Sequence, residues 1–474
     1  MKILRRCLAL VTCALAVAMS SALGEVWSRF RGPNGSGSVE DGSYPAEFGP
    51  EKNLIWKSAV RPGKSSPVLT EKHIFLTAFD EGKLYTLCFS RQTGELLWER
   101  AEERAREADI NRLNEPAANS PATDGENVYV MFRDTGLISY DAAGKMRWRT
   151  PLDPFATLMG HASSPIIAGG SLVVEADQRY GSYIAAFDPA NGEFQWRMER
   201  QESDGWATPL IYEREGEAPQ IVTASRGWVG AHNLSDGKRL WGLKKLPPAI
   251  VASPIVDGNT VYIFGYGNEP TSDFAGGFDR RDKDADGILT PEEYAGSAFM
   301  LGLAKLDGNR DGILTKEEFL TSARSTIAPS SLMAFRFDGD RASGDRTAAP
   351  PRELWRHERS FVGVIPSALI YRGVMYLIKN GGIFETLNPE TGEVLKRGRV
   401  RQAIEGYSAS PVAADGKIYL TSEGGKVSVL KAGPDGEVIA VNDLGEEMFA
   451  TPALSGGRIF VRTQKALYCF GITE

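Results

Sequence analysis

Short apolar strands alternate with polar, Gly-containing turns along nearly the whole chain. A typical unit opens on Ser-Pro or Thr-Pro, as at Ser66 and Ser164, and continues through strands in which apolar and β-branched residues alternate with polar ones. Each unit ends, after a Gly turn, on Trp or its substitute: Trp56, Trp98, Trp148, Trp196, Trp241, Trp355, Lys396 and Ala440. The pattern predicts a four-stranded unit that buries its faces only by packing against its neighbours.

The distribution of these units predicts a closed ring. Seven units carry their four strands in chain order, whereas the eighth takes three strands from 449–470 and its fourth from 53–57. An open β-solenoid would keep two exposed sheet edges, and a blade shared by the two chain ends removes them. We therefore predict an all-β fold, an eight-bladed β-propeller with four-stranded blades, a split closing blade and a small α-helical insert.

Gly turns that close on Trp resemble the repeat of pyrroloquinoline quinone (PQQ)-type β-propellers. Clear copies are 92–98 and 235–241, and the opening segment 27–35 is similar to that of a group of secreted bacterial propellers. The resemblance covers most of 25–474 and implies the propeller fold. The family holds PQQ-dependent alcohol dehydrogenases and also a non-enzymatic lipoprotein of the outer-membrane protein assembly machinery, so the resemblance leaves the function open.

One unit, between Trp241 and Trp355, is much longer than the others, and the extra residues form a predicted insert at 268–330. Two segments in the insert match the calcium-binding loop of an EF-hand at every ligand position. Oxygen ligands alternate along such a loop because calcium is a hard cation that takes six to eight oxygens. The predicted ligands are Asp282, Asp284, Asp286, the Ile288 carbonyl, Thr290 and Glu293, then Asp307, Asn309, Asp311, the Ile313 carbonyl, Thr315 and Glu318.

The close spacing of the loops predicts how they are joined. Ile288-Leu289 and Ile313-Leu314 should form a short β-pair, and 292–306 should form one helix shared by both loops, similar to dockerin-type calcium repeats. The alternative is an acidic, solvated loop without metal. We expect calcium to be structural, since extracellular calcium modules bind at about 10⁻⁴–10⁻³ M.

The net charge limits the kinds of partner that we expect, and the N-terminal residues indicate the compartment. The net charge of −7 argues against a nucleic-acid partner, because binding phosphates needs a basic surface. Residues 1–24 have the pattern of a signal peptide cleaved near Gly24, which predicts a periplasmic or secreted protein; lipid anchoring at Cys13 is disfavoured, and no transmembrane segment is expected. In the rest of the chain, Cys88 and Cys469 are interpreted as core residues, although export would permit a disulfide.

Candidate chemistry outside the insert is sparse. Rim residues Arg133, Asp177, Arg226 and Lys379 could face a central funnel, where cations could receive the carboxylates of PQQ, or they could form a solvated polar rim. The dehydrogenases of the family share an adjacent Cys pair that this chain lacks. His161 has no visible catalytic partner and is interpreted as structural.

Three functions remain open at this point. The first is a secreted, calcium-binding propeller that binds or scaffolds a protein or glycan at its rim, with no catalysis of its own. The second is a PQQ-dependent oxidoreductase. The third is an envelope factor similar to the assembly lipoprotein.

Overall fold

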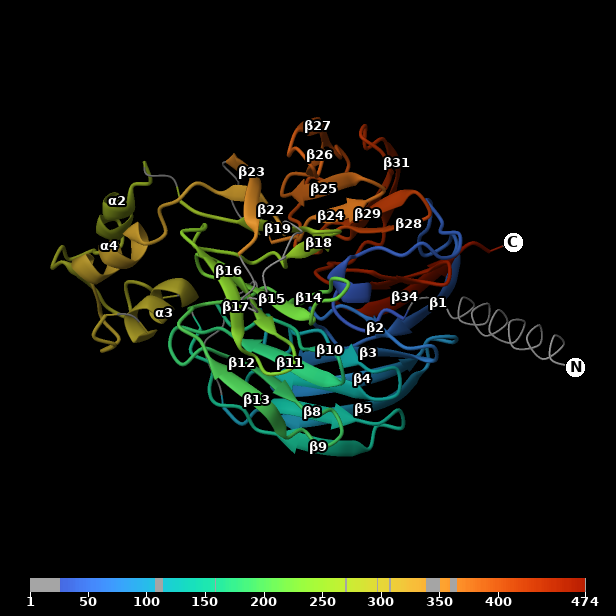
Figure 1. Ribbon diagram of the computed structural model, residues 1–474, viewed down its shortest axis with the longest axis horizontal. Helices are drawn as coiled ribbons and strands as arrows, with labels where there is room; N and C mark the ends of the chain where they lie inside the picture. Colours follow the sequence, from blue (N-terminus) through green and yellow to red (C-terminus); the bar gives the residue numbers. More distant parts are fainter. Residues whose placement is uncertain are drawn as a thin grey trace, which may run out of the picture.

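The computed structural model describes residues 26–106, 114–157, 159–268, 271–295, 297–306, 308–337, 350–358 and 365–473. The predicted leader, its cleavage site near Gly24, Cys13 and the predicted ligand Asp307 lie outside the described residues. In the part of the chain that is described, eight four-stranded antiparallel sheets are arranged around a central axis (Figure 1). The eight-bladed propeller is therefore confirmed.

The seven continuous blades follow the chain, each from its innermost to its outermost strand. The first two are β2 (Val68–Leu69), β3 (His73–Asp80), β4 (Lys83–Ser90), β5 (Leu96–Glu103), and β6 (Ala122–Thr123), β7 (Val128–Phe132), β8 (Gly136–Tyr140), β9 (Met146–Thr150). The third and fourth are β10 (Ile166–Ala168), β11 (Ser171–Ala176), β12 (Tyr183–Phe187), β13 (Phe194–Glu199), and β14 (Leu210–Tyr212), β15 (Gln220–Ser225), β16 (Trp228–Asn233), β17 (Arg239–Lys244). The fifth and sixth are β18 (Ile255–Asp257), β19 (Thr260–Gly265), β22 (Ser331–Arg336), β23 (Arg352–Glu358), and β24 (Leu369–Tyr371), β25 (Val374–Lys379), β26 (Ile383–Leu387), β27 (Val394–Arg399). The seventh is β28 (Val412–Ala414), β29 (Lys417–Thr421), β30 (Lys426–Lys431), β31 (Val438–Asp443).

The eighth blade joins the two ends of the chain. Its strands are β32 (Ala453–Ser455), β33 (Arg458–Arg462), β34 (Ala466–Gly471) and the N-terminal β1 (Leu54–Ala59). β1 pairs antiparallel with β34 and places Trp56 opposite Cys469. Cys469 and Cys88 are both buried and unbonded, which agrees with their interpretation as core residues.

The Trp and Gly of the repeated motif contact neighbouring blades. The Trp98 indole N–H donates to the Ala142 carbonyl of the next blade at 2.9 Å, and its ring packs against Gly144 there. A Cβ at Gly144, where φ is +78°, would lie 2.6 Å from that ring. The same contact joins a blade to the next one in the units that end on Trp56, Trp98, Trp148, Trp196 and Trp355. Gly is needed at the turn because it alone provides both the backbone conformation and the space.

An N-terminal segment, 26–49, crosses the ring at the end where the innermost strands finish. Trp27 accepts a backbone hydrogen bond from Leu69, and the Arg31 guanidinium donates to the Ala368 carbonyl at 2.6 Å. Arg31 is fully buried, and burial lowers its pKa to about 9. The segment contains a 3₁₀ turn, η1 (Pro33–Gly35), and contacts blades on several sides of the axis. It therefore closes this end of the central channel.

The insert connects β19 to β22 and stands out beside the ring (Figure 1). Its described elements are α2 (Phe274–Asp279), β20 (Ile288–Leu289), α3 (Ala298–Leu306), β21 (Leu314–Thr315) and α4 (Lys316–Arg324). The single helix predicted for 292–306 is too long, because 291–295 form turns and α3 begins only at Ala298. Among the described residues, no helix has the length and apolar character needed to cross a membrane.

Candidate functional site

The first loop of the insert gathers its predicted ligands around one point. Asp282, Asp284 and Glu293 each bring a carboxylate oxygen within 4.8 Å of the others. The chain turns sharply at Gly287, where φ is +84°, as the EF-hand pattern requires. Backbone N–H groups of Lys283 and Thr290 donate to the Glu293 carboxylate at 2.9 Å, so this ligand is already oriented.

The described part of the second loop has the same construction. Gly312 has a φ of +85°, and the Glu318 carboxylate accepts N–H groups from Asn309 and Thr315 at 3.0 Å. Asp311 accepts from the Ile313 N–H at 2.8 Å, just as Asp286 accepts from Ile288 in the first loop. Thr315 and Glu318 also form a capping box that begins α4.

A short β-pair and a small core hold the loops together. Leu289 lies opposite Leu314, and Ile288 lies opposite Thr315. The observed pair is therefore β20 with Leu314–Thr315, one residue beyond the predicted Ile313-Leu314. Both leucines are buried in a cluster that includes Phe278, Tyr294, Leu303 and Phe319. The two loops form one structural unit, since they share both the strand pair and this core.

Electrostatics in the loops reflect the crowding of carboxylates. Desolvation and the neighbouring Asp286 carboxylate raise the pKa of Asp284. Backbone N–H donors lower the pKa of Glu293 and of Glu318, which keeps both last-position carboxylates ionised. A dication would relieve the repulsion among the acids, and the oxygen-only donor set fits a hard cation such as calcium.

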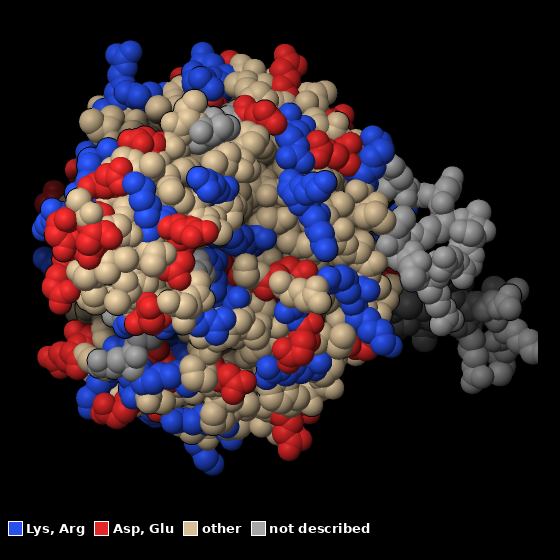
Figure 2. All heavy atoms as spheres, turned by 90° about the vertical axis from the view of Figure 1, so that its left-hand side faces the viewer, with Lys and Arg blue, Asp and Glu red and all other residues tan. Residues whose placement is uncertain are grey.

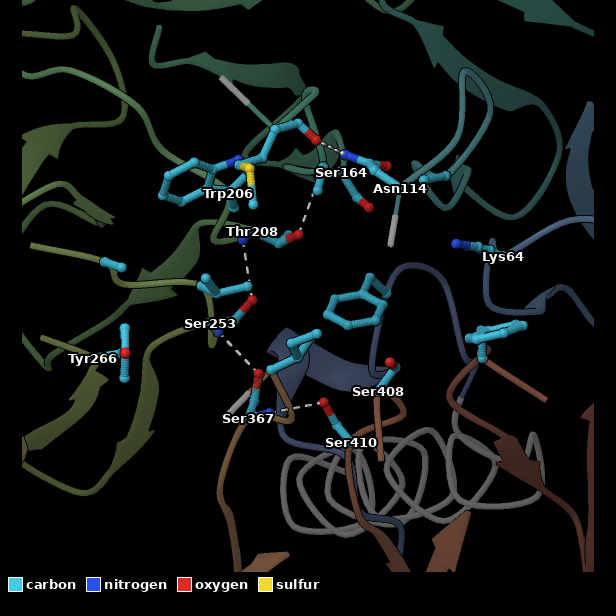
Figure 3. Close-up of a pocket in the computed structure, with 18 of the residues that line it drawn as sticks. Lys64, Asn114, Ser164, Trp206, Thr208, Ser253, Tyr266, Ser367, Ser408 and Ser410 are labelled. Carbon is cyan, nitrogen blue, oxygen red and sulfur yellow. Dashed lines mark hydrogen bonds between the residues drawn. The ribbon is translucent and has the colours of Figure 1, made fainter. Parts of the chain in front are cut away.

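A second feature lies on the axis of the propeller. Each blade supplies one hydroxyl to a closed ring of hydrogen bonds, in which a backbone N–H donates to the hydroxyl oxygen of the next blade at 2.9–3.0 Å. Figure 3 shows the part of this ring from Ser164 to Ser410. We call this the hydroxyl ring: Ser66, Ser120, Ser164, Thr208, Ser253, Ser367, Ser410 and Thr451. The ring bonds do not use the hydroxyl protons, so these stay available as donors. The hydroxyl ring explains why the units open on Ser or Thr, while the Pro that usually follows needs no N–H at the start of a strand.

The hydroxyl ring lines a cavity of about 570 Å³, a size typical of small-molecule sites. Phe30 of the N-terminal segment lines the cavity as well. Trp206 and Tyr266 lie on one side of the cavity and Lys64 on the other (Figure 3). Lys64 and Arg226 are the charged members of the lining, and among the described residues that line it none is Asp or Glu.

Of the four predicted rim residues, the structure brings only Arg226 to the cavity. Arg133 and Asp177 are buried in the connections that follow β7 and β11, and Lys379 ends β25 outside the lining. Asp177 forms a two-pronged ion pair with Arg200, with both N–O distances at 2.8 Å. Asp177 is therefore committed to a structural pair.

His161 is buried and held on both sides of its ring. Its Nε2–H donates to the Glu175 carbonyl at 3.0 Å, and Nδ1 accepts from the Asn119 amide at 3.1 Å. Burial lowers its pKa to about 4, so the ring is neutral near pH 7. The structural interpretation of this residue agrees with these contacts.

Sequence reasoning missed most of the cavity. Phe30, Lys64, Trp206 and Tyr266 come from separate parts of the chain and share no motif. The Ser/Thr-Pro positions carry a signal, but the pattern alone predicts the start of a strand and not a ring around the axis.

The cavity does not fit a metal-bound quinone. In such a site a metal needs acidic oxygen ligands beside the cofactor, and the described lining offers none. Lys64 and Arg226 could receive carboxylates, but the described lining offers no carboxylate to balance the charge of the cation.

Comparisons with known proteins agree with this architecture. The family model described as outer membrane protein assembly factor BamB matches residues 49–157, 87–277 and 382–470, which together exceed half of the chain. BamB of Burkholderia pseudomallei (strain K96243) is 25% identical over 225 residues, which is 46% of this chain and 55% of that protein. The chain thus spans about half the length of this curated relative.

Solved structures with similar folds come from more than one functional class. BamB from Moraxella catarrhalis has a TM-score of 0.56 at 13% identity, over 88% of this chain and 99% of that one. Quinohemoprotein alcohol dehydrogenase from Comamonas testosteroni has a TM-score of 0.57 at 12% identity, over 95% and 81%. A europium-containing methanol dehydrogenase has a TM-score of 0.57 at 11% identity, over 95% and 98%. At these identities the likeness shows the fold, and it is the family model that decides membership: the chain belongs to the outer membrane protein assembly factor BamB family.

Proposed function

We propose that this protein is a calcium-stabilised binding propeller of the cell envelope, with structural calcium at two EF-hand loops and a protein or glycan bound at its rim. The observation that carries the proposal is the convergence of the Asp282, Asp284 and Glu293 carboxylates within 4.8 Å on an EF-hand turn. The leader pattern in 1–24 supports export, and extracellular calcium would then keep the loops filled.

Calcium binding is tested by titration calorimetry on the purified protein after chelation. We expect two sites with dissociation constants of about 10⁻⁴–10⁻³ M. The variant Glu293→Gln should lose one site, and the double variant Glu293→Gln with Glu318→Gln should lose both. Glu95→Gln removes an exposed carboxylate of the propeller and should change nothing. Absence of calcium heat in the unmodified protein would refute the proposal.

Family membership favours a second candidate, an envelope assembly factor. The relatives are described as outer membrane protein assembly factors, and that role extends to this chain only as a hypothesis. Co-purification from envelope extracts with outer-membrane assembly components, tested with and without calcium, would favour it. Capture of other partners at the rim would favour the general binding role.

Quinone-dependent oxidation is the weaker alternative. It draws on the fold shared with quinoprotein dehydrogenases, whereas the described cavity lining has no acidic residue for a metal. Incubation with PQQ and calcium, followed by an absorption spectrum and a dye-linked alcohol assay, tests it directly. A bound quinone spectrum together with turnover would overturn the binding role.

A further inference from the structure

The insert forms part of the cavity wall. Asn268, where the chain enters the insert, and Thr326, where it leaves, both line the cavity. The Asn268 backbone N–H donates to the Thr326 carbonyl at 2.9 Å, and its amide nitrogen donates to the Thr326 hydroxyl at 2.7 Å. Tyr266, another lining residue, donates its hydroxyl proton to the Asn268 side chain at 2.9 Å. The two stems of the insert are therefore built into the cavity.

A single helix connects a predicted calcium ligand to this wall. α4 begins at the capping box of Thr315 and Glu318, and Glu318 is the last ligand position of the second loop. Immediately after α4, Ser325 accepts a hydrogen bond of 2.7 Å from the guanidinium of Arg226, and Thr326 enters the lining. An ion that held Glu318, and with it the start of α4, would also hold the end of α4 against the cavity.

Two further contacts join the insert to the third blade. Met159 lines the cavity and also packs against the core of the insert. In the second loop, the Arg310 guanidinium lies 4.6 Å from the centre of the Tyr180 ring, which belongs to the connection between β11 and β12. Loss of order in the insert would therefore disturb the cavity on more than one side.

The lining selects the chemistry of a ligand. Aromatic and aliphatic side chains such as Phe30, Trp206 and Phe449 suit a flat, apolar body. Lys64 and Arg226 are the charged groups of the described lining, and the ring hydroxyls add neutral donors, which suits an oxyanion. Carboxylates outside the lining also act on Lys64: Glu115, which accepts the Lys64 backbone N–H at 2.6 Å, and Glu423 and Glu447.

We propose that the cavity binds a small, mostly apolar molecule bearing an anionic group. We also propose that calcium at the insert strengthens this binding by fixing the position of α4 and of the part of the cavity wall at its end. The inference rests on the proposed calcium sites. Linkage requires the effect to be reciprocal, so the bound anion should also tighten calcium binding. Coupling between two sites is commonly about 5–150-fold.

The test uses the fluorescent probe 8-anilino-1-naphthalenesulfonate, which combines apolar rings with one sulfonate. We expect saturable binding in millimolar calcium and an affinity at least about 5-fold weaker after chelation. N-phenyl-1-naphthylamine has the same rings without the sulfonate and should bind more weakly. Lys64→Met should weaken the sulfonate probe and leave the neutral one unchanged.

Variants separate the cavity from the calcium link. Ala162→Trp adds bulk to the lining and should abolish binding of both probes; Val251→Trp, at another lining position, serves if the first variant does not fold. Ser325→Ala removes the contact between Arg226 and the end of α4, and should reduce the effect of calcium while leaving calcium heat intact. Glu318→Gln should leave weak probe binding that responds poorly to calcium, with Glu95→Gln as the unaffected control.

Each failure has a distinct signature. Normal calcium heat with equal probe affinity in calcium and chelator would overturn the link and leave the proposed calcium sites standing. Absence of calcium heat would remove the proposed function and this inference together. Probe binding that survives both Trp variants, or a neutral probe that binds as tightly as the sulfonate, would refute the assignment of the cavity.

Discussion

Replacement of Ser66 by Ala tests whether the hydroxyl ring holds the propeller closed. The Ser66 hydroxyl oxygen accepts the Thr451 N–H at 3.0 Å, across the joint between the split eighth blade and the first blade. Ser66→Ala deletes this acceptor and little else. Ser66→Thr keeps it, and the chain itself uses Thr at positions 208 and 451 of the same ring.

The expected cost follows from burial. Ser66 and Thr451 are only 2% and 3% exposed, so the Thr451 N–H loses its partner in a place that solvent reaches poorly. A buried donor left unsatisfied costs about 1–3 kcal/mol of unfolding free energy, roughly 5- to 150-fold in the folding equilibrium. Ser164→Ala orphans the Ser120 N–H between two continuous blades and should cost a similar amount.

Urea unfolding followed by tryptophan fluorescence measures these differences. Ser66→Ala and Ser164→Ala should lower the midpoint without changing the slope, and Ser66→Thr should stay within about 0.5 kcal/mol of the unmodified protein. Equal stability of Ser66→Ala and Ser66→Thr would refute the reasoning, because water from the cavity would then satisfy the N–H as well as the hydroxyl does.

Three further predictions concern packing, pH and buried charge. Gly94→Ala should lose more stability than Gly82→Ala in urea unfolding: both have positive φ, but a Cβ at Gly94 would meet the Trp56 ring at 2.5 Å, whereas Gly82 faces open space. Burial lowers the His161 pKa to about 4, so between pH 6.5 and 4 the unfolded chain binds a proton that the folded chain does not. The free energy of unfolding should therefore fall as the pH is lowered from 6.5 to 4, and it should fall less steeply in His161→Gln than in the unmodified protein. Arg462→Lys should lower the thermal midpoint, since a guanidinium that donates to the carbonyls of Arg61, Ser65 and Thr77 is replaced by one ammonium. An unchanged midpoint would show that those contacts contribute nothing.

The repeat and its closure could be predicted because their signals are local. A Gly turn and the Trp that follows it lie within seven residues, as in 92–98, and each copy repeats the same alternation of apolar positions. The missing fourth strand at the C-terminus then had one natural source, 53–57, and the pairing of Trp56 with Cys469 confirms it. Pattern and fold agree here because the same strand-and-turn pattern specifies each of the eight blades.

The path of the N-terminal segment could not be predicted from such signals. Arg31 contacts Ala368, 337 residues away, and no periodicity relates the two. Local pattern also overestimated the shared helix at 292–306, since 291–295 form turns and α3 begins only at Ala298. The interface between the insert and the cavity could not be predicted either, since Met159 and Thr326 are far apart in the sequence and only the fold brings both to the cavity lining.

The two ends of the central channel differ, and the insert lies at only one of them. Phe30 and the rest of segment 26–49 close the end where the innermost strands finish, and their hydrogen bonds to several blades fix that closure. The hydroxyl ring marks the other end, where Asn268 and Thr326 bring the insert to the lining. On the face that Figure 2 shows, acidic and basic side chains are interspersed. The insert therefore stands at one side of the cavity entrance, where the proposed calcium sites would act on binding through α4 and the lining residues Asn268 and Thr326, without the metal itself contacting the cavity.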